Sequence, residues 1–272
     1  MAGVAGEAEE TLTSSLSLLV NFGKMILQNA KEEAGASLEQ FVPHKIATMF
    51  ALITAADDFY NSIGVTTKSD AEATWAKSYH HAPVREEVEN LLQLESEWDS
   101  FLESVEAGLR PAETQGPEGS MADRLSGDVA LVDVRTAETV SLGQYLGKGK
   151  SLVLVLIRHF GGSAEGARVW LEQTGCTLPM LLDAQRTIYR AFGLGFSYAK
   201  VLKFEFLMQW AQYKTVGRDF PDFPQLLLGN IYQMGGDFVL NQEGKVLFSH
   251  HSQHPLDRPT LAGLLGPMPG KL

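Results

Sequence analysis

The feature that most restricts the fold of this chain is an apolar run from Leu152 to Ile157. Such an unbroken run predicts a buried β-strand. The run ends in Arg158-His159-Phe160, passes through Gly161-Gly162 and continues into a helical pattern that starts at Ser163. A buried strand that leads to a helix N-terminus is a place where α/β proteins often hold their chemistry. The search for a functional site therefore centres on residues 151–166.

The first part of the chain, residues 7–109, has the apolar spacing of three and four that is typical of helices. Three segments are predicted, at 7–35, 38–63 and 83–109, and the polar stretch 66–82 is predicted to be a loop. Together they predict an antiparallel three-helix bundle. Asp57-Asp58 and His80-His81 are adjacent pairs, and adjacent residues do not face each other on a helix. We therefore expect both pairs to be solvated surface.

A change of composition marks the end of this helical part. Residues 110–120 are rich in Pro, Gly and Glu and lack periodicity, which indicates a linker. Strand patterns at 129–134, 137–142, 152–157 and 178–182 then alternate with helical patterns at 163–174 and 184–192. This order predicts an α/β layer with parallel pairing. The predicted domains are a helical bundle at 1–110, a linker at 111–122 and a second domain at 123–272.

Two later stretches complete the second domain. Residues 196–214 are apolar and aromatic, and they predict either a helix over the sheet or a lid or partner-binding helix. The stretch GGDFVLNQEGKVLFSHH, which begins at Gly235, predicts a β-hairpin around a turn at Asn241–Gly244. A last helix is predicted at 258–265. The fold class is therefore α+β with two domains, a three-helix bundle followed by an α/β domain.

Charge excludes several classes of partner. The chain has 22 Lys and Arg against 33 Asp and Glu, a net charge of -11, and no basic patch. This balance repels nucleic acid and anionic membrane surfaces. The apolar runs are shorter than the roughly 18 to 20 residues that span a bilayer, and the N-terminal ten residues are acidic rather than basic. We expect a cytoplasmic protein with no nucleic-acid or membrane partner.

The chain contains one cysteine, Cys176. An internal disulfide, a dithiol motif and a thiolate zinc site are therefore excluded. Cys176 follows Gly175 at a predicted helix end and is expected to begin a buried strand, where a free cysteine usually packs as a small apolar residue. A structural role is predicted, and a one-cysteine peroxidase is the alternative. His250-His251 and His254 suggest a metal site with Asp257, but alternation along a strand separates the first two, so a structural role is preferred.

Three stretches, SLVLVLIRHF, LLDAQRTIYRAFGLG and GGDFVLNQEGKVLFSHH, occur in the order of a thioredoxin fold. They resemble the peroxiredoxin-like branch of the AhpC/TSA superfamily, and most closely the selenoprotein L group. The resemblance covers about 123–265 and implies a thiol or selenol oxidoreductase that acts in cell redox and antioxidant chemistry. It also implies a protein partner or thiol reductant and no bound cofactor.

The resemblance places the redox motif, C-x-x-C or U-x-x-U, directly after the R-H-F end of the strand. At those two positions this chain has Gly162 and Glu165, which cannot attack a peroxide. In the family a helix and a further strand also lie between the R-H-F strand and the helix that here starts at Ser163. That unit is missing, so we expect re-paired strands or a weakened, incomplete domain. A skipped exon that holds a selenocysteine codon would explain the gap.

The resemblance also assigns roles to the residues at the strand end. Arg158 and His159 flank the family active site and help to hold the nucleophile or the substrate. Without the nucleophile, the alternative is that they face water or pair with Glu165. Ser163 is expected to cap the following helix, and Glu165 suits its first turn. The predicted function is a peroxiredoxin-like homologue that is inactive in this form. The alternative is an interaction protein that uses the bundle and the 196–214 helix.

Overall fold

The computed structural model describes residues 2–109, 121–158, 163–218 and 230–268. The chain divides into two compact units, and each is described by itself. The first, here called the helical unit, comprises Met1–Pro111 and Val201–Pro221, and the second, the sheet unit, comprises Ala112–Lys200 and Asp222–Leu272. The predicted linker at 111–122 lies largely outside the described residues.

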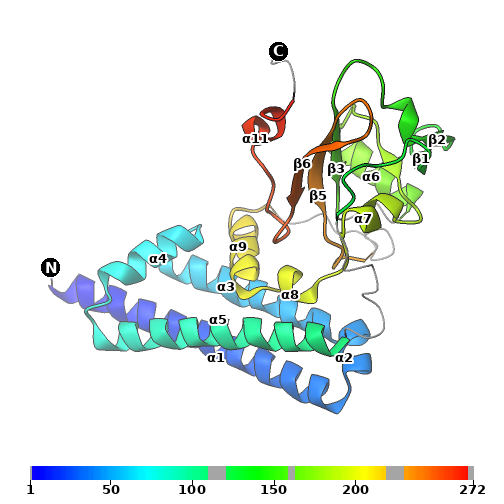
Figure 1. Cartoon of the computed structure of the whole chain (residues 1–272). Coiled ribbons are helices and arrows are strands. Elements are labelled where there is room, and N and C mark those ends of the chain that lie inside the picture. Colours follow the sequence, from blue (N-terminus) through cyan, green and yellow to red (C-terminus); the bar gives the residue numbers. More distant parts are fainter. Residues whose placement is uncertain (1, 110–120, 159–162, 219–229, 269–272) are drawn as a thin grey trace. The chain divides into compact units, whose positions relative to one another are not determined.

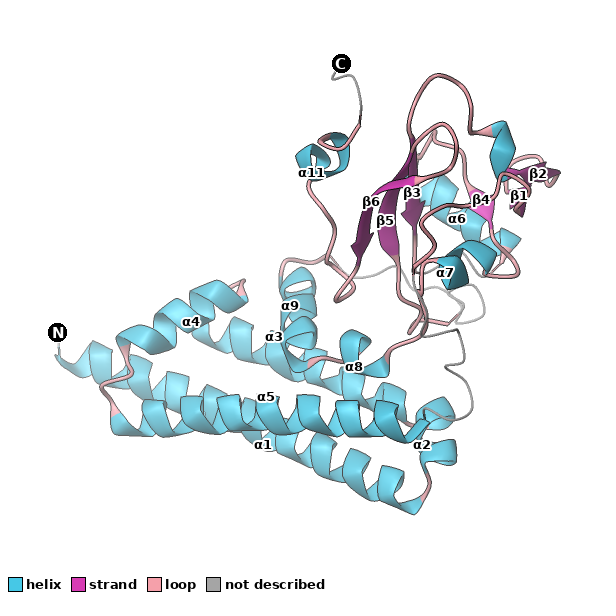
Figure 2. Cartoon of the chain, viewed as in Figure 1, coloured by secondary structure: helices cyan, strands magenta, loops and turns pink. Residues whose placement is uncertain are grey.

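The helical unit is formed by five helices of the N-terminal part and one from much later in the chain (Figures 1 and 2). They are α1 (Ala2–Ala36), α2 (Leu38–His44), α3 (Ala51–Ile63), α4 (Lys68–Lys77), α5 (Ala82–Leu109) and α9 (Phe204–Thr215), with a 3-10 turn, η1 (Ile46–Phe50). The helix α1 packs against α3 and α5, as the apolar spacing predicts. Fully buried large side chains, among them Trp98, Tyr60, Phe41, Leu16 and Leu52, make up the core.

The predicted loop at 66–82 is wrong, because it contains α4. The Thr67 hydroxyl accepts a hydrogen bond from the backbone N–H of Asp70 at 3.1 Å and so caps this helix. Only Ala71 of α4 is buried, so the helix carries no apolar stripe that a periodicity search could detect. The predicted single helix at 38–63 is likewise divided into α2, η1 and α3.

The helix α9 belongs to the helical unit, whereas the sequence placed all of 123–272 in the second domain. The indole N–H of Trp98 donates to the carbonyl of Leu202 at 2.9 Å, and the Tyr60 hydroxyl donates to the carbonyl of Met208 at 3.1 Å. A carboxylate oxygen of Asp99 accepts from the backbone N–H of Phe204 at 2.9 Å. The helical unit is therefore discontinuous in sequence, and its core depends on residues after 200.

Asp57 was expected on the surface and is instead 92% buried, since only 8% of it is exposed. One carboxylate oxygen accepts from the Asn61 amide at 3.0 Å and from the Thr215 hydroxyl at 2.9 Å. The other lies 3.3 Å from the ammonium of Lys214. These contacts satisfy a buried carboxylate and join α3 to the end of α9.

We expect Asp57→Ala to lower the free energy of unfolding by about 1–3 kcal/mol, because it removes a buried carboxylate together with its hydrogen bonds to Asn61 and Thr215 and its ion pair with Lys214. Asp58→Ala is the matched control, since Asp58 is the exposed neighbour on the same helix. It is expected to change stability by no more than about 0.5 kcal/mol. Urea unfolding followed by circular dichroism measures both, and equal effects of the two substitutions would contradict the structural role of Asp57.

The sheet unit holds two three-stranded sheets. The first has the order β2-β1-β4, from β1 (Ala130–Asp133), β2 (Thr139–Ser141) and β4 (Leu181–Leu182). The second has the order β3-β5-β6, from β3 (Leu152–Leu156), β5 (Gly236–Leu240) and β6 (Val246–His251). All four pairings between these strands are antiparallel. The prediction of parallel pairing is therefore wrong for the described strands, because β3 pairs with the later hairpin and not with another strand of the alternating series.

One apolar core joins the two sheets. It contains Leu131 of β1, Leu156 of β3 and Phe238 of β5. The rings of Phe192 and Phe238 stack at its centre, with centroids 3.8 Å apart. The elements η2 (Leu142–Gln144) and α7 (Thr187–Ala191) contribute to this core. The remaining short helices are α6 (Ala164–Thr174), which packs on a separate small core, α8 (Tyr198–Val201) and α11 (Leu261–Leu265). The unit is α+β, and its helices and small sheets are consistent with a thioredoxin-like domain.

The hairpin predicted around Asn241–Gly244 is present as β5 and β6. The Asn241 side chain accepts from the backbone N–H of Glu243 at 3.0 Å and of Lys245 at 2.8 Å, which fixes the turn. Gly244 has φ +81°, a conformation that side chains disfavour, and a Cβ there would lie 2.5 Å from the carbonyl oxygen of Leu125.

Candidate site at the end of strand β3

The strand β3 delivers Arg158 to the place where the sequence predicts a site. Arg158 is 9% exposed, and its guanidinium donates to two backbone carbonyls. Nε donates to Gln233 at 3.0 Å, and Nη2 donates to Ile231 at 2.7 Å. The prediction that Arg158 faces water or pairs with Glu165 is therefore wrong. Its donors instead brace the segment that leads into β5.

A second guanidinium, that of Arg258, lies beside Arg158. Its Nη1 forms an ion pair of 2.9 Å with Asp237, which is 3% exposed, and its Nη2 donates to the carbonyl of Leu156 at 3.4 Å. Burial, with a smaller contribution from the charge of Arg258, lowers the pKa of Arg158 to about 10. Arg158 is thus still a cation at neutral pH.

Gly235 lies between the two arginines. A Cβ on this residue would lie 2.3 Å from the carbonyl oxygen of Leu156, 3.1 Å from Cγ of Arg158 and 3.5 Å from Nη2 of Arg258. Only glycine allows the backbone to approach β3 so closely. The first glycine of the pair Gly235-Gly236 is therefore required by the close packing of this segment against β3.

A third arginine, Arg186, reaches the same segment from the loop before α7. Its Nη1 donates to the side-chain oxygen of Gln233, whose backbone carbonyl receives Arg158. Asp183 caps α7 by accepting from the N–H groups of Thr187 at 2.8 Å and Ile188 at 2.7 Å. No role was predicted for Arg186, Gln233, Asp237 or Arg258, because their partners lie far away along the chain. Arg186 and Asp237 stand within the stretches LLDAQRTIYRAFGLG and GGDFVLNQEGKVLFSHH, which is the one signal that could have found them.

The Tyr189 hydroxyl closes the carbonyl end of β3. It donates to the carbonyl of Ile157 at 2.7 Å, and burial raises its pKa to about 12. A neutral, buried phenol near Arg186 and Arg258 acts as a hydrogen-bond donor and not as a base at neutral pH.

The other residues predicted at this site divide into two groups. His159 and Gly162 lie outside the described residues. Ser163 caps α6, with its hydroxyl accepting from the backbone N–H of Gly166 at 3.0 Å, and Glu165 is exposed in the first turn. Capping and the helix dipole account for these two side chains.

Cys176 lies in a loop and does not begin a strand, since β4 starts only at Leu181. Gly175 ends α6 with φ +61°, as expected for a helix terminus. Cys176 is partly buried beside the small core around Leu171 and Leu182, and its carbonyl accepts from Nη2 of Arg135 at 2.5 Å. These contacts are those of a structural residue.

The adjacent histidines His250 and His251 have different partners. His250 Nε2 lies 3.1 Å from a carboxylate oxygen of Asp257, whereas His251 Nε2 lies 2.7 Å from the carbonyl oxygen of Phe192. The alternation along β6 explains the different partners. The described part of the chain contains no group of three or more His, Cys, Asp or Glu side chains that could hold a metal ion.

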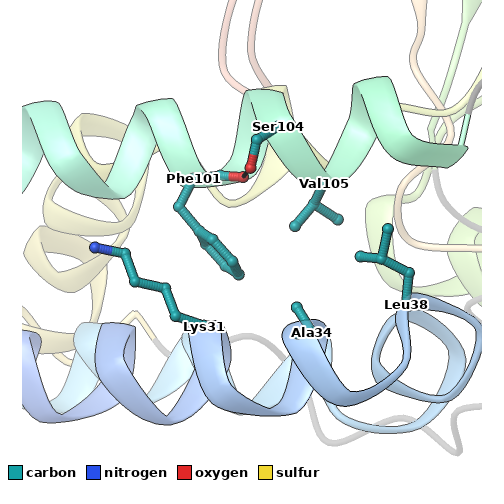
Figure 3. A pocket seen from close by; sticks show the side chains of 7 residues that line it. Lys31, Ala34, Leu38, Phe101, Ser104 and Val105 are labelled. Atoms are coloured by element: carbon teal, nitrogen blue, oxygen red, sulfur yellow. Dashed lines mark hydrogen bonds between the residues drawn. The ribbon is translucent and has the colours of Figure 1, made fainter.

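The helical unit carries a surface groove of about 270 Å³ between α1 and α5 (Figure 3). Apolar side chains, among them Ala34, Phe101 and Val105, line it. Lys31 is at its edge and lies 3.4 Å from Glu97. A lining of this kind offers mainly apolar contact, with Lys31 and Ser104 as its polar side chains.

Residues 139–254 match the family described as AhpC/TSA antioxidant enzyme. The matched segment runs from β2 through β6. It therefore includes Arg158 and the two residues whose carbonyls accept from it, Ile231 and Gln233. No curated protein and no solved structure matched. The family match supports a redox function of the peroxiredoxin-like, thioredoxin-like kind in general.

Of the helices that the structure describes, none combines the length and the apolar character needed to cross a membrane.

Proposed function

We propose that this chain is a selenoprotein L-type homologue of the peroxiredoxin-like thiol and selenol oxidoreductases, and that it does not itself reduce peroxides or disulfides. The observation that carries the proposal is the sequence at the end of β3. The family match continues on both sides of this point, while the two motif positions are Gly162 and Glu165. Reduction of a peroxide requires a thiolate or selenolate, and neither residue can supply one.

The two separate sheets support the idea that a helix-strand unit is missing. β3 and β4 are each paired on one side only by the described strands. Both belong to a unit with one shared core. A strand between them would join the two sheets into one, and a thioredoxin-like domain needs such a central strand. Its loss accounts for the two small sheets without any other change of topology.

A selenocysteine codon read as a stop offers a reason for the gap at Gly161-Gly162. A coding sequence assembled around that codon would skip the exon that encodes the motif helix and the strand. Sequencing the transcript across this junction tests the idea, because an in-frame UGA within an additional exon is expected. A native transcript that is continuous across Gly161-Gly162 would exclude it.

The activity test uses the full chain and Cys176→Ser. With hydrogen peroxide or an alkyl hydroperoxide and excess dithiothreitol, we expect both proteins to consume peroxide at the rate of the buffer alone. Insulin disulfide reduction is likewise expected to stay at background. Turnover by the full chain that Cys176→Ser abolishes would contradict the proposal and favour a one-cysteine peroxidase. Turnover that survives the substitution would contradict it as well.

The alternative, an interaction protein that binds partners through 196–214, has less support. Phe204, Phe206 and Leu207 of α9 are at most 4% exposed. They pack within the helical unit, so this apolar face is already covered by the protein's own helices. The helical unit itself still lacks an assigned role, and its groove between α1 and α5 is the feature that a binding study would address.

A further inference from the structure

The buried guanidinium of Arg158 has no anionic partner among the described residues. Its two hydrogen bonds go to the neutral carbonyls of Ile231 and Gln233. A buried charge without a countercharge is unfavourable, and proteins normally pair it. The charged group that affects the pKa of Arg158 is Arg258, which is also a cation. Bracing two carbonyls explains the position of the side chain but leaves its charge unbalanced.

The surrounding charges do not remove this excess. Three arginines, Arg158, Arg186 and Arg258, converge on the segment from Ile231 to Gly236. The two buried carboxylates of this region are already engaged, Asp237 by Arg258 and Asp183 by the N-terminus of α7. Three cations therefore lie beside two anions, in a chain whose net charge is -11.

The geometry leaves donors available. Arg158 uses Nε and Nη2, while its Nη1 makes no hydrogen bond to a described residue. Arg258 approaches the same point, because a Cβ on Gly235 would lie within 3.5 Å of both side chains. The free N–H donor of Arg158 matches an oxygen of phosphate and related tetrahedral anions. Both Nη atoms of Arg258 already bind Asp237 and Leu156, so Arg258 would contribute its positive charge.

We propose that Arg158 and Arg258 form a binding site for a small tetrahedral oxyanion of the phosphate type. The anion would lie against Nη1 of Arg158 and balance the charge of this side chain. Such a site does not depend on the redox motif, so it can function in a chain that lacks the family nucleophile. No covalent step is involved.

The test titrates inorganic phosphate into the full chain at constant ionic strength and follows binding by isothermal titration calorimetry and by broadening of the phosphate ³¹P resonance. Saturable binding is expected, with competition by sulfate and none by chloride. Glycerol phosphate serves as a second probe, because it separates a site open to phosphate esters from one that accepts only the free ion. Thermal unfolding with and without phosphate gives an independent readout, since a ligand of the native state raises the midpoint.

Arg158→Lys keeps the charge but removes the fork, and it is expected to raise the dissociation constant of phosphate about tenfold or more. Arg135→Lys is the matched control, because Arg135 also donates to two backbone carbonyls of the sheet unit, those of Cys176 and Leu178. Arg258→Lys provides the same comparison if Arg158→Lys does not fold. An absence of saturable phosphate binding overturns the proposal, as does equal affinity in the arginine-site variants and in Arg135→Lys.

Discussion

Trp98→Ala is expected to lower the free energy of unfolding of the helical unit by about 3–5 kcal/mol. Trp98 is 0% exposed, and its ring packs edge to face against Phe204, with centroids 5.8 Å apart. The substitution leaves a large cavity and also removes the donor that satisfies the carbonyl of Leu202. Both losses fall where α5 contacts α9 and the residues just before it. We therefore expect α9 to separate from the rest of the helical unit first.

Urea unfolding followed by far-ultraviolet circular dichroism measures the loss, and limited proteolysis reports whether cleavage within 201–221 becomes faster. Trp98→Phe is the control that keeps an aromatic ring and removes the N–H donor. It is expected to cost less than Trp98→Ala, because most of the buried apolar surface remains. A loss below about 1 kcal/mol for Trp98→Ala would show that the contact with α9 contributes little.

A chimera that carries the helix-strand unit that we propose to be missing is expected to gain peroxidase activity. The block to insert at Gly161-Gly162 is the helix and strand of a family relative that carries the C-x-x-C motif. Because the first cysteine would stand at a helix N-terminus, its pKa is lowered and a reactive thiolate forms. We expect peroxide consumption at least about a hundredfold above that of the present chain, by analogy with the loss on removing a catalytic nucleophile.

The matched control is the same chimera with both cysteines replaced by serine, which restores the strand without the thiols. It should fold like the active chimera and remain at background. Circular dichroism and thermal unfolding establish whether each chimera is folded, and the restored strand is expected to raise the unfolding midpoint of both. A folded chimera with the cysteine pair and no activity would contradict the assignment to a thiol oxidoreductase lineage.

Local patterns predicted those parts of the fold that depend on neighbours in sequence. The hairpin of β5 and β6, its turn at Gly244 and the cap of α6 at Ser163 were all read from the sequence and are present. Each depends on residues within a few positions of one another, where turn chemistry and alternation act directly. The helix α4 was missed because only Ala71 of it is buried, so its sequence lacks the apolar periodicity of a packed helix.

Contacts between distant residues could not be predicted. Asp57 was assigned to the surface because charged residues usually are, but Lys214 and Thr215, more than 150 residues later, supply its partners. Arg158 likewise finds its acceptors at Ile231 and Gln233. A single sequence shows that a side chain is polar, and it does not show which distant group will satisfy it.

The sequence by itself determined that the chain has one cysteine, which excludes an internal dithiol site. The place of a redox motif at the end of β3, and its replacement by Gly162 and Glu165, stay predictions that rest on the resemblance. Only the tertiary structure decided that α9 completes the helical unit, that the described strands pair antiparallel in two sheets, and that Arg158 is buried among arginines. The physical reason is that periodicity identifies which face of an element is apolar, whereas the surface that covers this face is chosen by packing across the whole chain.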